Sequence, residues 1–395
     1  MPENKTIGIL TFHRPINYGA FLQAYSLSAY LQKRYPACRV EIIDYIAPAE
    51  QKKIYKNALR ALKHDGWRAF FRECRKIQVF HKSVKALPLS PSIGGKGLSA
   101  LFRYIAARYD AVLVGSDAVL NWNQNGYPSA FYLNYDFQLP MFMYAASVHG
   151  MDYERISEEQ KQAVGQAFAR FALFGVRDRN TERFIAQYRE REVITHTCDP
   201  TVFIDIRQCR EKAGSVRERL LHQYGFDMEK PYIALMLNDD VISRRVKEAY
   251  GDRYKLVSLF KTNRACDCFL YDLNPFEWVE VLAGSALTVT QYFHAALLSL
   301  RHCKAPVVVD KAKNTDRFES KLHDLMIVRF ELPALYFADR DLQNDLAAFS
   351  AACETVLRED FTEQIERALA RETASMEQFM ARLDNDIQGK AESDE

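Results

Sequence analysis

The chain has 395 residues, of which 48% are hydrophobic and 26% charged, and its formal net charge at pH 7 is +2. This composition is typical of a folded chain with two or three domains and excludes disorder as the main state. No apolar run approaches the 18 residues of a membrane-spanning helix, and the first residues do not resemble a secretory signal.

The first half of the sequence predicts a series of α/β units. A strand over 6–12, a helix over 19–34 and a strand over 39–45 form a β–α–β opening, which is typical of a parallel sheet. Residues 51–87 are predicted to be helical with a break near Asp65-Gly66, and 88–97 to form a loop. Further helices are expected over 98–108, 157–172 and 179–190, and further strands over 110–114, 141–146, 173–177 and 193–198.

The same plan repeats after about residue 230. Strands are expected over 232–237, 255–260, 286–290 and 306–309, and helices over 241–250, 275–284 and 292–302. We therefore predict an α/β fold of two Rossmann-like doubly wound domains facing a cleft. The first domain is assigned to 1–205, the second to 206–340, and 341–395 to a C-terminal helical segment that packs back on the domains.

Eight cysteines are scattered through the chain without a CxxC pair, so we predict reduced thiols and neither a zinc site nor a disulfide framework. In doubly wound sheets the loops after the strands carry function. The polar residues expected in these loops are His13, Asn17, Tyr18, Gly19, Ser116, Asp117, Ser147, His149, Arg177, Asp178, Asn238, Asp239, Lys261, Arg264, Gln291 and His294.

Several of these residues belong to motifs that follow one another in a fixed order. The motifs are Asn17-Tyr18-Gly19-Ala20-x-Leu22-Gln23-Ala24-Tyr25, Gly115-Ser116-Asp117-x-Val119-x-Asn121, Ala145-Ala146-Ser147, Val176-Arg177-Asp178, Asp199-Pro200-Thr201, Thr290-Gln291-Tyr292-Phe293-His294-Ala295 and Lys304-Ala305-Pro306. Over roughly residues 7–320 this ordered set resembles the polysaccharide pyruvyl transferase family. The resemblance implies a GT-B-like architecture. It also implies transfer of pyruvate from phosphoenolpyruvate to a sugar diol as a ketal, without a metal or other cofactor.

The sequence departs from the family pattern at a few positions. Gln291 and Tyr292 stand where the family has Asp-Ser, and Ala295 replaces its glycine. Three interpretations therefore stay open. The first is a pyruvyl transferase of cell-surface polysaccharide synthesis, and the second is a GT-B-like glycosyltransferase that uses a nucleotide sugar. The third is a non-catalytic glycan-binding relative, which the departures keep open. The ordered motif set favours the first.

Ketal transfer needs an acid, a base and cations. His294 is the candidate acid, because an imidazole titrates near the working pH; the alternative is a core histidine bonded to a carbonyl. Asp117 is the candidate base, or else it caps a turn. The Arg177 guanidinium would donate two parallel hydrogen bonds to a carboxylate or phosphate of the substrate, or else form an ion pair with Asp178 or Glu182. The substrate-binding candidates are Arg177, Asn17, Tyr18, Gly19, Ser116, Lys261 and Gln291, and no metal ligand is predicted.

A basic block stands out against the small net charge, which does not indicate a nucleic-acid partner. Residues 51–110 hold 14 Lys/Arg against three acids, and 51–87 interleave these bases with apolar residues. This pattern fits a basic amphipathic helix on an anionic membrane surface, or else the solvated face of a packed helix. The expected partners are phosphoenolpyruvate, a nucleotide- or lipid-linked sugar acceptor and this membrane surface. The expected location is the cytoplasm or the inner face of the membrane.

Overall fold

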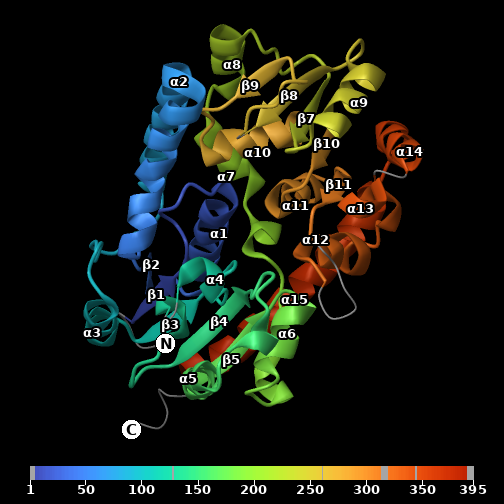
Figure 1. Cartoon of the computed structure of the whole chain (residues 1–395). Helices are drawn as coiled ribbons and strands as arrows, with labels where there is room; N and C mark the ends of the chain where they lie inside the picture. Colours follow the sequence, from blue (N-terminus) through green and yellow to red (C-terminus); the bar gives the residue numbers. More distant parts are fainter. Residues whose placement is uncertain (1–4, 127–128, 260, 313–318, 343–344, 389–395) are drawn as a thin grey trace. The chain divides into compact units, whose positions relative to one another are not determined.

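The computed structural model describes residues 5–126, 129–259, 261–312, 319–342 and 345–388. The chain divides into two compact units. Unit 1 is assembled from Met1–His64, His81–Phe203 and Glu372–Glu395, and unit 2 from Asp65–Phe80 and Ile204–Arg371. Two helices, α2 (Pro48–Val84) and α15 (Thr362–Gln388), therefore contribute residues to both units (Figure 1).

Unit 1 is built on a six-stranded sheet whose paired strands are all parallel, in the order β2-β1-β3-β4-β5-β6 (Figure 1). The strands are β1 (Thr6–Leu10), β2 (Arg39–Ile42), β3 (Ala111–Val114), β4 (Met141–Ala146), β5 (Phe171–Val176) and β6 (Ile194–His196). Because β2 and β3 flank β1 on opposite sides, the carboxyl ends of β1 and β3 form a topological switch point, where such sheets bind ligands.

The helices of unit 1 begin with local capping bonds. The N-cap of α1 is Asn17, whose Oδ1 accepts from the Ala20 amide, and α5 starts with a capping box of Ser157 and Gln160. These helices are α1 (Tyr18–Arg34), α3 (Leu98–Arg108), α4 (Trp122–Asn125), α5 (Glu158–Phe168) and α6 (Arg179–Ile185). The end of α15 packs closely on the sheet, since a Cβ at Gly175 would lie 2.8 Å from the Phe379 ring.

Unit 2 has a second parallel six-stranded sheet, in the order β12-β11-β10-β7-β8-β9. Its strands are β7 (Tyr232–Met236), β8 (Lys255–Leu259), β9 (Cys268–Leu270), β10 (Leu287–Thr290), β11 (Val307–Asp310) and β12 (Tyr336–Ala338). Its helices are α7 (Ile206–Ala213), α8 (Val216–Tyr224), α9 (Asp240–Tyr250), α10 (Pro275–Gly284), α11 (Phe293–Arg301), α12 (Lys321–His323), α13 (Asp339–Leu342) and α14 (Leu346–Arg358). This is the Rossmann strand order, and its switch point lies between β7 and β10.

The predicted class, two doubly wound α/β units with parallel sheets, is confirmed. The helices predicted over 98–108 and 275–284 match the structure residue for residue. The charged stretch 207–219, which the sequence analysis did not assign, lies in α7 and α8. Strands β9 and β12 were not predicted, because each is a three-residue edge strand without a recognisable pattern.

The predicted break in the long basic helix is also present. Within α2, Gly66 adopts a φ of 79°, a left-handed conformation that favours glycine, and helical geometry is interrupted there. Residues up to His64 belong to unit 1, and Asp65–Phe80 belong to unit 2. Among the helices of the described residues, none combines the length and the apolar character that crossing a bilayer requires.

Candidate functional site

Asp117 lies on a tight turn at the carboxyl edge of the unit 1 sheet, directly after β3. Its φ of 75° is left-handed, a conformation that costs energy in a residue other than glycine and that collects at functional sites. Gly115 has a φ of 129°, and a Cβ there would lie 2.0 Å from the Tyr144 carbonyl oxygen, so only glycine fits. The Ser147 amide donates to the Asp117 carbonyl at 2.9 Å, which ties the turn to β4 and fixes the carboxylate.

The Arg177 guanidinium lies buried between two aspartates of unit 1. Its Nη2 donates to Oδ1 of Asp117 at 2.8 Å, and its Nη1 donates to Oδ2 of Asp199. Each of the three residues is at most 6% exposed. Burial alone would lower the pKa of Arg177, but the nearby carboxylates, Asp199 first, raise it above its usual value. Arg177 therefore stays charged and is the shared cation of both aspartates.

Asp199 is the second anchor of this cluster. Its Oδ2 also accepts from Nε2 of Gln23 at 2.6 Å, and its Oδ1 accepts from the amide and the hydroxyl of Thr201 at 3.0 and 2.7 Å. A buried network with this many donors holds its members in one arrangement. The network joins four of the sequence motifs: 17–25, 115–121, 176–178 and 199–201.

The other unit 1 candidates lie close to the same sheet edge. Asn17 acts as the N-cap of α1, and Tyr18 and Gly19 form the buried first turn. Ser116 is 1% exposed, and its hydroxyl makes no hydrogen bond within the described part of the chain. Asp178 caps α6 by accepting from the Thr181 amide.

In unit 2, polar side chains meet where β7 and β10 end. Oε1 of Gln291 accepts from the Asn238 amide at 2.9 Å, and Nδ2 of Asn238 donates to the Tyr292 hydroxyl at 3.2 Å. Nζ of Lys261 lies 6.0 Å from the centroid of the Tyr292 ring, within reach of a weak cation–π attraction. The structure thus brings two predicted residues, Gln291 and Lys261, around the tyrosine that departs from the family pattern.

His294 lies in the first turn of α11 at this same switch point. It is 8% exposed, and its ring packs edge-on against Phe293 with the ring centroids 5.2 Å apart. The Tyr292 amide that precedes this turn donates to Oγ1 of Thr290 at 2.9 Å. His294 therefore belongs to unit 2 and Asp117 to unit 1, so each unit carries one of the two predicted catalytic residues.

Two residues of this arrangement were missed as site candidates from the sequence. Asp199 and Gln23 were noticed only as members of motifs, and no role was assigned to either. The available signal was that Asp199 directly follows a strand and precedes Pro-Thr. Arg177 donates hydrogen bonds to Asp117 and Asp199, and the charge of Asp178, which chain proximity suggested as a partner, also raises the pKa of Arg177. No group of three His, Cys, Asp or Glu suited to a metal ion occurs among the described residues.

Comparison with known proteins identifies the family of this chain and shows which solved structures share its fold. The model of the polysaccharide pyruvyl transferase family matches residues 17–310, whereas no curated protein matches the chain significantly. The UDP-GlcNAc 2-epimerase from Neisseria meningitidis bound to UDP-GlcNAc has a TM-score of 0.53 at 10% identity, covering 95% of this chain and 100% of that chain. The Methanocaldococcus jannaschii UDP-GlcNAc 2-epimerase has a TM-score of 0.53 at 12% identity, and the match covers 94% of this chain and 99% of that chain. At such identities the likeness shows the fold, and the predicted GT-B-like class is confirmed.

Proposed function

Because the chain belongs to the polysaccharide pyruvyl transferase family, we propose that it transfers pyruvate from phosphoenolpyruvate to a sugar diol as a ketal, in the synthesis of a cell-surface polysaccharide. The observation that carries this proposal is the buried network of Asp117, Arg177 and Asp199. It joins four family-like motifs at the carboxyl edge of a parallel sheet, where α/β enzymes keep their active groups. A purely structural ion pair would not explain why those motifs converge on one strained turn.

The proposed reaction defines what the side chains must do. The methylene carbon of phosphoenolpyruvate takes up a proton and becomes the methyl group of the ketal. One sugar hydroxyl bonds to the central carbon and loses its proton. The second hydroxyl then bonds to the same carbon while the carbon–oxygen bond to phosphate breaks, and its proton leaves with the phosphate. The protein must therefore supply one acid, one acceptor of hydroxyl protons and stabilisation of anionic oxygens.

We assign the acid to His294, because an imidazole can deliver a proton near neutral pH. The Asp117 carboxylate accepts the hydrogen bond of an attacking hydroxyl. Arg177 acts as a positioning residue that holds the Asp117 carboxylate in place, since both terminal nitrogens of its buried guanidinium already donate to aspartates. This replaces the direct clamp on phosphoenolpyruvate that its sequence position suggested. The anion-binding role falls to Lys261 and to the start of α1 at Asn17, where helix amides attract phosphate.

Phosphoenolpyruvate is expected to raise the melting temperature of the protein. A ligand at 100 times its dissociation constant adds about 2.7 kcal/mol of stability. The measurement is a thermal-shift series with phosphoenolpyruvate, UDP-sugars and, as a matched phosphorylated control, 3-phosphoglycerate. Stabilisation by a nucleotide sugar alone would fit the glycosyltransferase or a nucleotide-linked acceptor, and no response to any compound would favour the non-catalytic relative. Release of phosphate from phosphoenolpyruvate upon addition of a sugar diol is the corresponding activity test.

We further propose that α2 attaches the enzyme to an anionic membrane surface. In its unit 1 part, Lys52, Lys56, Arg60 and Lys63 are exposed at spacings that place them along one helix face. In its unit 2 part, Trp67 and Phe71 are 65% and 64% exposed, which is unusual for large apolar side chains. Exposed aromatic rings beside basic residues are typical of helices that lie in a membrane interface.

Liposome co-sedimentation is expected to show binding to vesicles with anionic lipid that fades at high salt, because each Lys/Arg contributes about 1 kcal/mol near such a surface. Lys52→Glu/Lys56→Glu/Arg60→Glu should weaken this binding at least tenfold, and Trp67→Ser/Phe71→Ser should weaken it as well. The matched control reverses three exposed bases elsewhere, Lys230→Glu/Arg244→Glu/Arg245→Glu. A wild-type protein that stays in the supernatant with anionic vesicles at low salt would show that α2 is only a solvated helix.

A further inference from the structure

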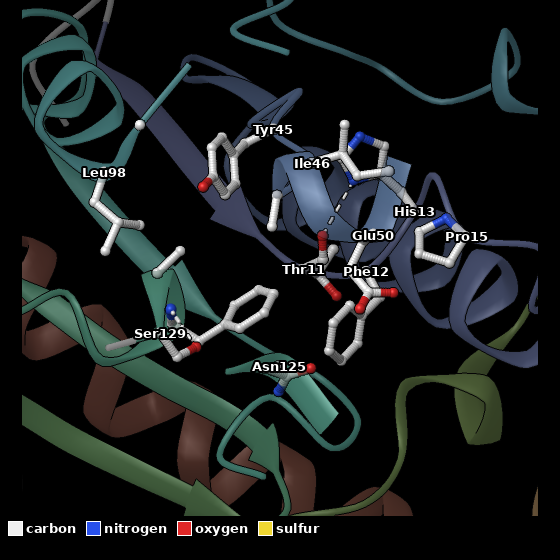
Figure 2. A pocket seen from close by; sticks show the side chains of 14 residues that line it. Thr11, Phe12, His13, Pro15, Tyr45, Ile46, Glu50, Leu98, Asn125 and Ser129 are labelled. Atoms are coloured by element: carbon white, nitrogen blue, oxygen red, sulfur yellow. Dashed lines mark hydrogen bonds between the residues drawn. The ribbon is translucent and has the colours of Figure 1, made fainter. Parts of the chain in front are cut away.

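Unit 1 contains a pocket of about 250 Å³ at the topological switch point of its sheet. Its wall comes from the segments that follow β1 and β2, from the first residues of α3, and from the loop beyond β3 (Figure 2). The volume lies just below the roughly 300–1,000 Å³ of typical ligand pockets, so it suits one ring-sized ligand rather than a nucleotide sugar. None of the residues assigned above to catalysis lines it.

The pocket wall combines aromatic rings with a few polar groups. Phe12, Tyr45 and Phe131 line it, and the Phe12 and Phe131 rings pack edge to face with centroids 4.8 Å apart. Glu50 and Asn125 supply a carboxylate and an amide, and Figure 2 shows both near Phe12, with Tyr45 across the space. Aromatic faces that cover C–H groups, with acceptors and donors for hydroxyls beside them, are the chemistry that recognises a sugar ring.

The charges of the pocket disfavour an anionic ligand. Arg14 and His13 could attract anions, but both are bound to Asp44: Nε of Arg14 donates to its Oδ1 at 2.7 Å, and Nε2 of His13 lies 3.0 Å from the same oxygen. Burial alone would raise the pKa of Asp44, but the bonds from His13 and Arg14 hold it well below its usual range. Because Arg14 and His13 are both engaged by Asp44, the Glu50 carboxylate on the wall disfavours phosphate and carboxylate groups.

The pocket is also tied to the turn that carries Asp117. Nδ2 of Asn125, which lines the pocket, donates to the carbonyls of Ala118 and Val119 at 2.9 and 3.2 Å. The Val119 amide in turn donates to the Asp117 carbonyl at 2.7 Å. One pocket residue therefore supports the turn on which the proposed hydroxyl-activating carboxylate stands.

We infer that this pocket binds an uncharged sugar ring, and that it is the acceptor subsite of unit 1. The aromatic rings hold the faces of the sugar, and the Glu50 carboxylate accepts hydrogen bonds from its hydroxyls. Sugar binding follows from the pocket itself, whereas the role as acceptor subsite rests on the proposed function.

The test is ligand-observed NMR of the full-length protein with a panel of methyl glycosides, without phosphoenolpyruvate. At least one neutral glycoside should bind at millimolar concentration, and Glu50→Gln should weaken its binding about tenfold, the typical loss for a charge-assisted hydrogen bond. Gly97→Trp should abolish binding, because a side chain at Gly97 starts in open space at the pocket wall and meets no atom within 4 Å. The matched controls, Glu159→Gln and Ser99→Trp at exposed positions outside the pocket, should bind as the wild type does.

The outcomes separate this inference from the proposed function. If no glycoside binds, or if Gly97→Trp and Glu50→Gln bind as well as the controls while melting normally, the pocket is not a sugar site. Glycoside binding that depends on these residues, in a protein that never releases phosphate from phosphoenolpyruvate, would uphold the sugar site and refute the pyruvyl transfer. Loss of phosphate release in Gly97→Trp but not in Ser99→Trp would support the acceptor role.

Discussion

Replacing His294 with alanine is expected to lower turnover about 10²–10⁴-fold while the protein stays folded, because that is the usual contribution of a positioned general acid. The side chain is buried at the start of α11, at the switch point of the unit 2 sheet. The measurement is the rate of phosphate release from phosphoenolpyruvate with a sugar diol, alongside a thermal melt. Phosphoenolpyruvate binding, measured separately, should change much less than turnover.

The matched control is His222→Ala, which removes an exposed histidine of α8 in the same unit. It should leave both turnover and melting temperature close to the wild-type values. A His294→Ala protein that melts normally and turns over at the full rate would remove this residue from the mechanism. One that unfolds would show that the ring serves the core instead.

Arg177→Met is expected to lower the free energy of unfolding by about 3–5 kcal/mol, because it leaves two buried carboxylates without their shared cation. Asp117 and Asp199 are 6% and 4% exposed, so water cannot replace the lost partner. The measurement is equilibrium denaturation. The control, Arg155→Met, breaks an ion pair with Asp152 in which the arginine is 87% exposed, and should change stability little. Equal stability losses in the two variants would contradict a buried cluster.

Arg177→Lys separates positioning from substrate binding. Lysine keeps the charge but lacks the planar fork that donates to Asp117 and Asp199 together. A positioning role predicts a lower kcat with the KM for phosphoenolpyruvate nearly unchanged. A KM that rises while kcat is unchanged would instead show that Arg177 binds the donor, phosphoenolpyruvate, as its place in the sequence first suggested.

Local patterns predicted much of the secondary structure and the placement of the candidate loops. The strand over 141–146 and the helix over 275–284 depend on neighbouring residues, so periodicity and spacing were enough. The motif order led to Asp117 and Arg177, which the structure joins by a hydrogen bond. The proposed roles of these residues and of His294 stay predictions.

Long-range pairing was beyond the reach of the sequence. Gln23 and Asp199 are 176 positions apart, and nothing in either segment indicates that one donates to the other. The pocket combines loops after different strands, and Glu50, which directly precedes the basic block, belongs to none of the sequence motifs. Such long-range contacts depend on the order of the strands in the sheets, and a single sequence does not reveal that order.

The path of the chain through the two units also has a consequence for how the protein is made. Unit 1 needs residues from α15, since Arg34 pairs with Asp384 and Tyr144 packs on Phe379. These residues leave the ribosome only after all of unit 2 has been synthesised. At about 5–20 residues per second, the N-terminal sheet waits roughly ten seconds or longer for its last helix. During that time α15 does not cover the sheet face around Gly175. We therefore expect the nascent chain to bind chaperones. For the same reason, a fragment that ends near residue 205 would not be a complete domain.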